Sequence, residues 1–200
     1  VLRRLNARLD PINHDEWVEH IEMMRDMYPL RYDRDRLTGP FIVETIDELT
    51  KGDAVICTEV GQHQMWAAQY YKFRKPRTFL TSGGLGTMGY GLGASIGAKM
   101  GCGDMGHPDI PVFNIAGDGC FRMNMNEIGT AARYNIPVIE VVINNHVLGM
   151  VRQWQTAFYG KRYSSTDPER KTDYVKLAEG FGAKGYRCET MAEFRAALAE

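Results

Sequence analysis

The 200-residue sequence lacks three features that mark other classes of protein. It has no apolar run approaching the roughly 20 residues that a membrane-spanning helix needs, so we expect no membrane protein. It has no excess of positive charge, because its 24 lysines and arginines are balanced by 25 aspartates and glutamates. Nucleic-acid binding is therefore disfavoured. Its four cysteines are widely spaced without a CxxC pair, which argues against a zinc or redox site and favours free thiols in a cytoplasmic protein.

The two ends of the sequence indicate a piece of a longer polypeptide. It begins at Val1 without an initiator methionine or a signal segment, and it stops within an amphipathic run at residues 191–200. Apolar side chains repeat on one helical face between residues 17 and 28, and a charged stretch follows them. We therefore expect residues 1–37 to form a linker with one helix, and residues 38–200 to form one domain of ordinary size.

From residue 42 onward, short apolar runs alternate with helical patterns. This alternation predicts an α/β fold, namely a doubly wound, mostly parallel sheet flanked by helices. In such sheets, ligands bind outside the carboxyl ends of the strands. Strands are predicted at residues 54–57, 78–80, 111–116 and 138–143, with an edge strand at 183–188; helices are predicted at 42–49, after Gly61, in the second half of 81–98, and at 121–132, 174–181 and 191–198.

Two polar motifs follow neighbouring predicted strands. Asp118 stands in a Gly-Asp-Gly motif after one strand, and Asn145 ends an Asn-Asn pair after the next. Carboxylate and amide oxygens suit Mg²⁺, which keeps few protein ligands and completes its shell with water and phosphate oxygens. Gly117 and Gly119 allow close approach of the backbone, and a helix that begins near Cys120 directs free amide hydrogens at an anion. Either motif alone is more often an ordinary turn, but together they indicate a magnesium-diphosphate site.

The Gly-Asp-Gly motif followed by Asn-Asn resembles the signature of thiamine-diphosphate-dependent enzymes. Flanking segments are similar to the large catalytic subunit of the acetolactate synthases, also called acetohydroxyacid synthases, and this resemblance runs from Trp17 to the end of the chain. Subunits of that family have a pyrimidine-binding domain, a central domain that holds FAD and a diphosphate-binding domain, of which this chain matches only the third. The segments that carry the resemblance are residues 59–69, 81–98 and 144–155.

The resemblance implies roles for individual residues. Asp118, Asn145 and the carbonyl group of Val147 would ligate Mg²⁺. Met88 would lie beneath the thiamine diphosphate and enforce its bent shape, while the Gly86 carbonyl group would bind the aminopyrimidine. The residues implied in cofactor binding are Gln62, His63, Gly86, Met88, Gly117, Asp118, Gly119, Cys120, Asn145, Val147, Leu148, Gly149 and Met150.

The resemblance also implies a reaction. These enzymes decarboxylate pyruvate and condense the two-carbon unit with a second 2-keto acid, in the biosynthesis of isoleucine and valine. Met150 and Trp154 would line the substrate pocket, and Trp154 would favour 2-ketobutyrate as the acceptor. The glutamate that activates the pyrimidine ring lies in the first domain of a partner subunit, so we expect no catalytic residue in this chain and no activity from it alone.

The family further implies a homodimer or tetramer and a small regulatory subunit. Two other interpretations remain open. Another carboligase with the same cofactor, such as a glyoxylate carboligase or a catabolic acetolactate synthase, would share both motifs. A non-catalytic binding domain that kept a phosphate cradle would share them too.

Three rival motifs are weaker. Residues 84–89 fit the GxGxxG pattern of dinucleotide-binding proteins, with Asp104 about 20 residues further on. Residues 93–97 fit the GxSxG pattern of hydrolases, but a glycine-rich helix start precedes Ser95 where a strand is needed. The basic and aromatic segment 70–77 could contact nucleic acid, but the net charge favours a solvated loop or a subunit contact.

Overall fold

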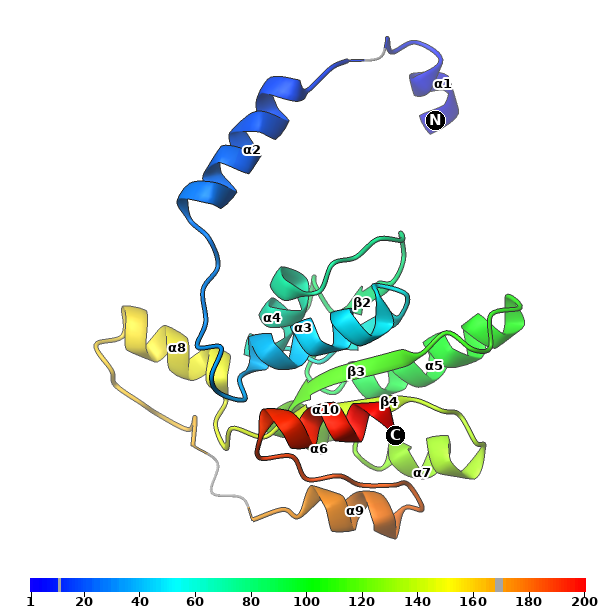
Figure 1. The fold of residues 1–200 in the computed structure, drawn as a ribbon, viewed down its shortest axis with the longest axis vertical. Helices are drawn as coiled ribbons and strands as arrows, with labels where there is room; N and C mark the ends of the chain where they lie inside the picture. The colour runs from blue at the N-terminus through cyan, green and yellow to red at the C-terminus, as the bar shows by residue number, and fades with distance from the viewer. Residues whose placement is uncertain (11, 168–170) are drawn as a thin grey trace. The chain divides into compact units, whose positions relative to one another are not determined.

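The computed structural model describes residues 1–10, 12–167 and 171–200, in two compact units, Val1–Asp33 and Arg34–Glu200 (Figure 1). The first unit contains α1 (Leu2–Asn6), which the sequence pattern does not predict, and α2 (Asp15–Met27), which confirms the predicted helix. None of the 13 residues of α2 is buried within the unit.

The second unit is built on a sheet of four parallel strands in the order β2-β1-β3-β4. The chain runs from β1 to β2 on one side, then crosses back to β3 on the other side of β1, so the direction of winding switches between β1 and β3. This arrangement confirms the predicted doubly wound α/β fold. The strands are β1 (Val55–Thr58), β2 (Phe79–Thr81), β3 (Val112–Gly117) and β4 (Ile139–Ile143).

Alternate side chains of the strands build a core on each face of the sheet. Ile56 and Phe113 point to one face, where α3, α4 and α10 contribute apolar residues. Val55 and Val112 point to the other face, which α5, α6, α7 and α9 cover. The helices are α3 (Gly39–Thr50), α4 (Gln62–Tyr70), α5 (Gly91–Asp104), α6 (Asp118–Asn124), α7 (Glu127–Arg133), α8 (Gly149–Phe158), α9 (Tyr174–Gly180) and α10 (Met191–Ala199). No helix in the described ranges is long and apolar enough to cross a bilayer.

The single helix predicted at residues 121–132 is wrong, because the structure divides it into α6 and α7. Asn124 ends α6, and its side-chain amide donates a hydrogen bond of 2.6 Å to the carbonyl oxygen of Gly89. Asn126 directly precedes α7 and donates to the side chain of Glu127. Asparagine side chains compete with helical backbone bonds and favour turns, which explains the break.

The predicted edge strand at residues 183–188 is also wrong, since these residues form no ladder in the described part of the chain. The Ala183 amide donates to the Ala178 carbonyl oxygen at 2.9 Å, which keeps the segment close to α9. Lys184 pairs with Glu200 at 3.0 Å, and Arg187 with Asp173 at 3.2 Å. Bonds to its helical neighbours therefore take the place of bonds to a strand.

Candidate functional site

The carboxyl ends of the strands lie at one edge of the sheet and bring distant polar residues together. Thr58 of β1 is in register with Ile115 of β3, and Gly117 of β3 is in register with Ile143 of β4. Asp118 is the first residue after β3 and begins α6 directly. Because the winding switches between β1 and β3, the expected ligand position lies between their carboxyl ends.

Three glycines at this edge are in close contact with residues that the resemblance assigns to the cofactor. A Cβ atom added at Gly119 would lie 2.5 Å from Cδ2 of Leu148 and 3.8 Å from Cε of Met88. One added at Gly117 would lie 3.0 Å from the imidazole ring of His63. The structure therefore brings together segments near residues 63, 88, 118 and 148, which are far apart in sequence.

Gln62 and Asn145 meet at the third of these glycines, Gly149. A Cβ atom there would lie 2.2 Å from Oε1 of Gln62 and 3.2 Å from Nδ2 of Asn145. Gln62 also donates to the side chain of Gln153 at 2.9 Å, which connects α4 with α8. A side chain at position 149 would have to displace the Gln62 amide, so at this point the site has a cradle made of backbone.

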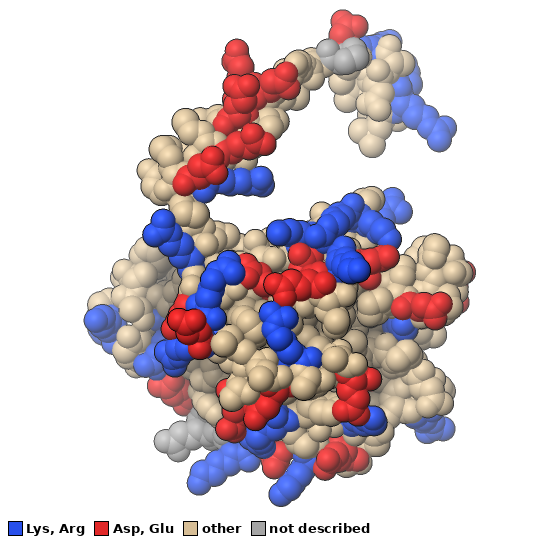
Figure 2. Space-filling model, in the orientation of Figure 1, with Lys and Arg blue, Asp and Glu red and all other residues tan. Residues whose placement is uncertain are grey.

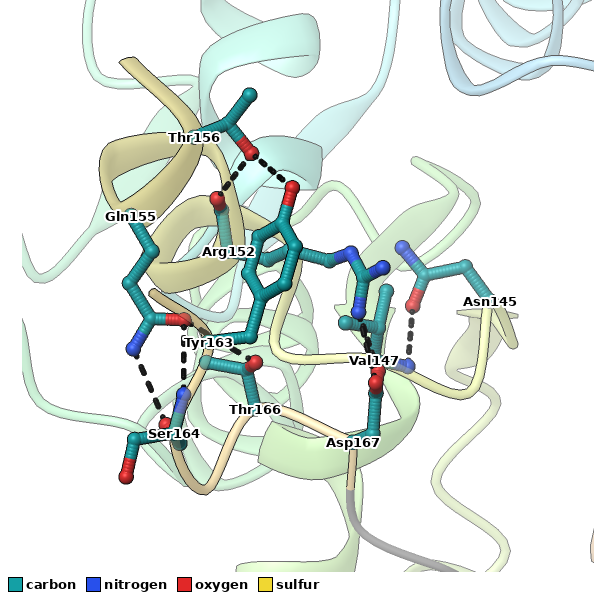
Figure 3. A network of polar contacts seen from close by, with 9 residues as sticks. All are labelled: Asn145, Val147, Arg152, Gln155, Thr156, Tyr163, Ser164, Thr166 and Asp167. Carbon is teal, nitrogen blue, oxygen red and sulfur yellow. Dashed lines mark hydrogen bonds and ion pairs between the residues drawn. The ribbon is translucent and has the colours of Figure 1, made fainter. Parts of the chain in front are cut away.

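The candidate metal donors are a carboxylate, an amide and a backbone carbonyl. Asp118 is 3% exposed, and Asn145 is exposed with Oδ1 accepting the Val147 amide at 3.1 Å (Figure 3). The described residues contain no group of three or more His, Cys, Asp or Glu side chains that could hold a metal. One carboxylate with neutral oxygens suits Mg²⁺ rather than zinc.

Cys120 follows Asp118 by two residues, and its thiol has a backbone partner. Its thiol donates to the Val60 carbonyl oxygen at 2.9 Å, and burial raises its pKa to about 12, so it stays protonated at neutral pH. All four cysteines lie in the described ranges and are free thiols, as the sequence predicts.

His63 is a neutral, buried side chain at the same edge. It is 6% exposed, and burial lowers its pKa to about 4. Its Nε2 atom is buried without a hydrogen-bond partner among the described residues. Such an atom is costly unless a ligand completes it. This atom, the glycine cradle and the oxygen donors together fit a diphosphate with its Mg²⁺.

Glu59, which the sequence analysis does not single out, organises the loop that leads into α5. Its carboxylate is 1% exposed and accepts hydrogen bonds from the backbone amides of Gly89 at 2.6 Å, Gly91 at 2.9 Å and Leu92 at 3.3 Å. Burial raises the pKa of Glu59, and the backbone hydrogen bonds act against this rise. The signal in the sequence is an acidic residue directly after a buried strand, where it needs partners.

An open pocket of about 520 Å³ lies beside α8, which the sequence pattern does not predict as a helix. Trp154 is 56% exposed there and packs edge-on against Phe158, with ring centroids 5.4 Å apart. Met150 and Trp154, the two residues implied in substrate binding, thus border one pocket. Its lining residues are Met150, Val151, Trp154, Gln155, Tyr159 and Arg162.

Polar contacts attach α8 to the segment that follows it (Figure 3). Arg152 pairs with Asp167 at 2.7 Å and lies over the ring of Tyr163, and the Gln155 side chain donates to the Ser164 carbonyl oxygen at 3.1 Å. The amide of Leu148 donates to the carbonyl oxygen of Thr166 at 2.9 Å. These bonds orient the start of α8 and with it the residues after Asn145.

Behind the site, Asn114 and Glu140 form a pair across β3 and β4. The two residues are in register, and Nδ2 of Asn114 donates to both carboxylate oxygens of Glu140, at 2.8 and 3.0 Å. The pKa of Glu140 is raised to about 8, chiefly by burial and in small part by the nearby carboxylate of Glu59, while the hydrogen bonds from Asn114 act against the rise. Glu140 is therefore mostly protonated in the folded protein at neutral pH.

This raised pKa predicts that stability falls as the pH rises. Between pH 4.5, the ordinary value for glutamate, and about 8, the unfolded chain releases this proton and the folded chain keeps it. We expect the free energy of unfolding to fall by on the order of 4 kcal/mol across this window, and Glu140→Gln to remove most of the fall. Urea unfolding at several pH values measures it. Glu48→Gln changes an exposed residue and is the control, which should leave the pH dependence of the free energy of unfolding unchanged. An unchanged pH dependence in Glu140→Gln would show that Glu140 does not keep its proton in the folded protein.

The structure does not support the rival motifs. Ser95 is buried within α5, and its hydroxyl donates to the carbonyl oxygen of Leu92 at 2.7 Å, so it is no exposed nucleophile. The glycines of residues 84–89 lie in the loop between β2 and α5 and do not lead directly from a strand into a helix. In the basic segment, Arg74 pairs with Asp47 and Lys75 with Asp53, and Figure 2 shows blue and red side chains interspersed.

A doubly wound sheet with an acidic, glycine-lined site at its switch point defines a diphosphate-binding domain of the nucleotide or cofactor type. The sequence model of one family, described as "Thiamine pyrophosphate enzyme, C-terminal TPP binding domain", matches residues 59–200. The chain therefore belongs to this family, and the predicted thiamine-diphosphate-binding domain is confirmed.

Among individual proteins, the chain is similar to large subunits of acetolactate synthase. It is 46% identical over 190 residues to the acetolactate synthase large subunit of Corynebacterium glutamicum, an alignment that covers 92% of this chain and 30% of that protein. It is 40% identical over 196 residues to the acetolactate synthase isozyme 2 large subunit of Escherichia coli, covering 97% of this chain and 35% of that protein. The chain thus spans about a third of the length of these relatives.

Proposed function

We propose that this chain supplies the diphosphate and metal site of an acetolactate synthase large subunit. The observation that carries the proposal is the cluster at the carboxyl edge of the sheet, where three glycines, two of them flanking Asp118, lie in close contact with side chains that include Asn145. The pocket of Met150 and Trp154 follows directly after the third glycine, Gly149. The similarity to acetolactate synthase large subunits supports this enzyme over other thiamine diphosphate enzymes.

In the proposed site, Asp118, Asn145 and the Val147 carbonyl group bind Mg²⁺, which neutralises the diphosphate. Gln62, His63 and the amides of Gly119 and Cys120 bind the diphosphate oxygens. The Gly86 carbonyl group and the Met88 side chain hold the pyrimidine end and set its orientation. The bound cofactor supplies the carbon nucleophile and the electron sink for decarboxylation of a 2-keto acid. The chain itself contributes binding and positioning.

The rest of the proposed enzyme lies outside this chain. A glutamate of a partner subunit activates the pyrimidine ring, and a separate domain binds most of the FAD. We propose a homodimer or tetramer with a small regulatory subunit, and pyruvate and 2-ketobutyrate as the 2-keto acids. A second carboligase reaction, that of a glyoxylate carboligase or a catabolic acetolactate synthase, would use the same diphosphate site with another acceptor.

Acetolactate formation from pyruvate tests the proposal, measured on a complete polypeptide that carries this domain. We expect product only with both thiamine diphosphate and Mg²⁺, a preference for 2-ketobutyrate as acceptor, and no product from the 200-residue chain alone. Trp154→Leu should lower that preference by about tenfold, the effect of one lost apolar contact. Trp17→Leu, the same substitution in α2 and outside the pocket lining, should leave the preference unchanged. A cofactor-bound polypeptide that makes no acetolactate would instead indicate another carboligase.

A further inference from the structure

The amide and the carbonyl group of Gly89 each form a hydrogen bond with a side chain, and the two side chains come from different parts of the fold. Its amide donates to the Glu59 carboxylate at the end of β1, at 2.6 Å, and its carbonyl oxygen accepts from Nδ2 of Asn124 at the end of α6, also at 2.6 Å. Gly89 is buried with φ +89°, and an added Cβ atom would lie 3.0 Å from Cβ of Met123. We call Glu59, Gly89 and Asn124 the Gly89 clamp.

The clamp is anchored to the start of α5 as well. The same Glu59 carboxylate accepts from the amides of Gly91 and Leu92, which belong to the first turn of this 14-residue helix. A carboxylate at a helix N-terminus is stabilised by the free amides and by the helix dipole. At 1% exposure the carboxylate has little room to exchange these partners for water. One side chain therefore fixes both the loop and the helix that follows it.

The position of the clamp connects the two ends of the proposed cofactor site. Met88 directly precedes Gly89, and its Cε lies within 4 Å of the Cβ position of Gly119. Asn124 belongs to α6, the helix that Asp118 begins. The clamp thus bonds the loop of Gly86 and Met88 to the helix that carries the metal ligand.

We propose that Glu59 and Asn124 are positioning residues, which fix the Met88 loop relative to Asp118 and so set the separation between the pyrimidine and diphosphate ends of one cofactor. This inference rests on the proposed function. It predicts a selective effect, because loosening the clamp displaces the pyrimidine end while the diphosphate end keeps its own ligands. A purely structural role would weaken both ends together.

The test compares two ligands, thiamine diphosphate and inorganic diphosphate, each titrated with saturating Mg²⁺ into a complete polypeptide. For Asn124→Ala, we expect affinity for thiamine diphosphate to fall by about tenfold, the effect of one lost hydrogen bond, with affinity for inorganic diphosphate unchanged. Without ligand, amide hydrogen exchange at Gly89 and Gly91 should be faster by a similar factor. Asn126→Ala, two residues away at the same turn, is the matched control and should change neither.

Glu59→Gln should show a larger selective loss, with Asp47→Asn as the control for a buried carboxylate on another element. Glu59→Gln could fail to fold because Glu59 is buried. Asn124 is exposed, so the Asn124→Ala variant decides whether the proposal holds. If Asn124→Ala binds both ligands as the unsubstituted protein does, or loses both equally, the clamp proposal is overturned and the proposed function stands. If the unsubstituted protein binds no thiamine diphosphate, both are overturned.

Discussion

Asp118→Ala is expected to abolish the Mg²⁺-dependent binding of thiamine diphosphate. Asp118 is the one negatively charged member of the proposed ligand set, since Asn145 and the Val147 carbonyl group offer only neutral oxygens. Its 3% exposure leaves no space for water to replace the carboxylate without rearrangement. Loss of a buried charge contact should lower the affinity at limiting Mg²⁺ by at least about 100-fold. Titration with thiamine diphosphate at several Mg²⁺ concentrations measures this.

Two comparisons make the Asp118 result specific. Asp53→Ala removes an exposed carboxylate that pairs with Lys75 at 2.7 Å, and it should leave cofactor binding unchanged. Asn145→Ala should have an intermediate effect, because it removes one neutral ligand and also the acceptor for the Val147 amide. An unchanged affinity of Asp118→Ala at limiting Mg²⁺ would remove this residue from the ligand set.

The sheet and its functional edge could be predicted from sequence because both depend on local patterns. A buried parallel strand such as β3 is a nearly continuous apolar run, and the residue after it must lie at the carboxyl edge. The Gly-Asp-Gly and Asn-Asn motifs therefore locate the edge without any knowledge of long-range contacts. The break between α6 and α7 could not be found in this way, since the apolar spacing continues through it.

The Gly89 clamp could not be predicted because it depends on contacts between distant residues. Glu59 and Gly89 are 30 positions apart in sequence, and Asn124 is 35 from Gly89. No periodicity relates them, and a buried glutamate looks the same in a sequence as an exposed one. The predicted edge strand failed for a related reason, since ion pairs of Lys184 and Arg187 with distant residues fix that segment outside the sheet.

Gly91→Ala is expected to destabilise the fold strongly, because the first residue of α5 touches the sheet. A Cβ atom there would lie 2.2 Å from Oδ1 of Asn114 and 2.9 Å from the backbone nitrogen of Glu59. Asn114 is fully buried and donates two bonds to Glu140, so it cannot turn away without breaking them. The helix must move instead, which would also lengthen the bonds of Glu59 to α5.

We expect Gly91→Ala to lower the free energy of unfolding by about 3 kcal/mol, the upper end for overpacking, and Tm by roughly 10 °C. Urea and thermal unfolding measure both. Gly97→Ala in the same helix is the matched control, because a Cβ atom there meets nothing within 4 Å. Since alanine favours a helix by about 1 kcal/mol over glycine, that variant should be more stable. Equal stabilities of the two variants would show that α5 does not lie against Asn114. A lower free energy of unfolding for Gly91→Ala and a higher one for Gly97→Ala would locate the contact at Gly91.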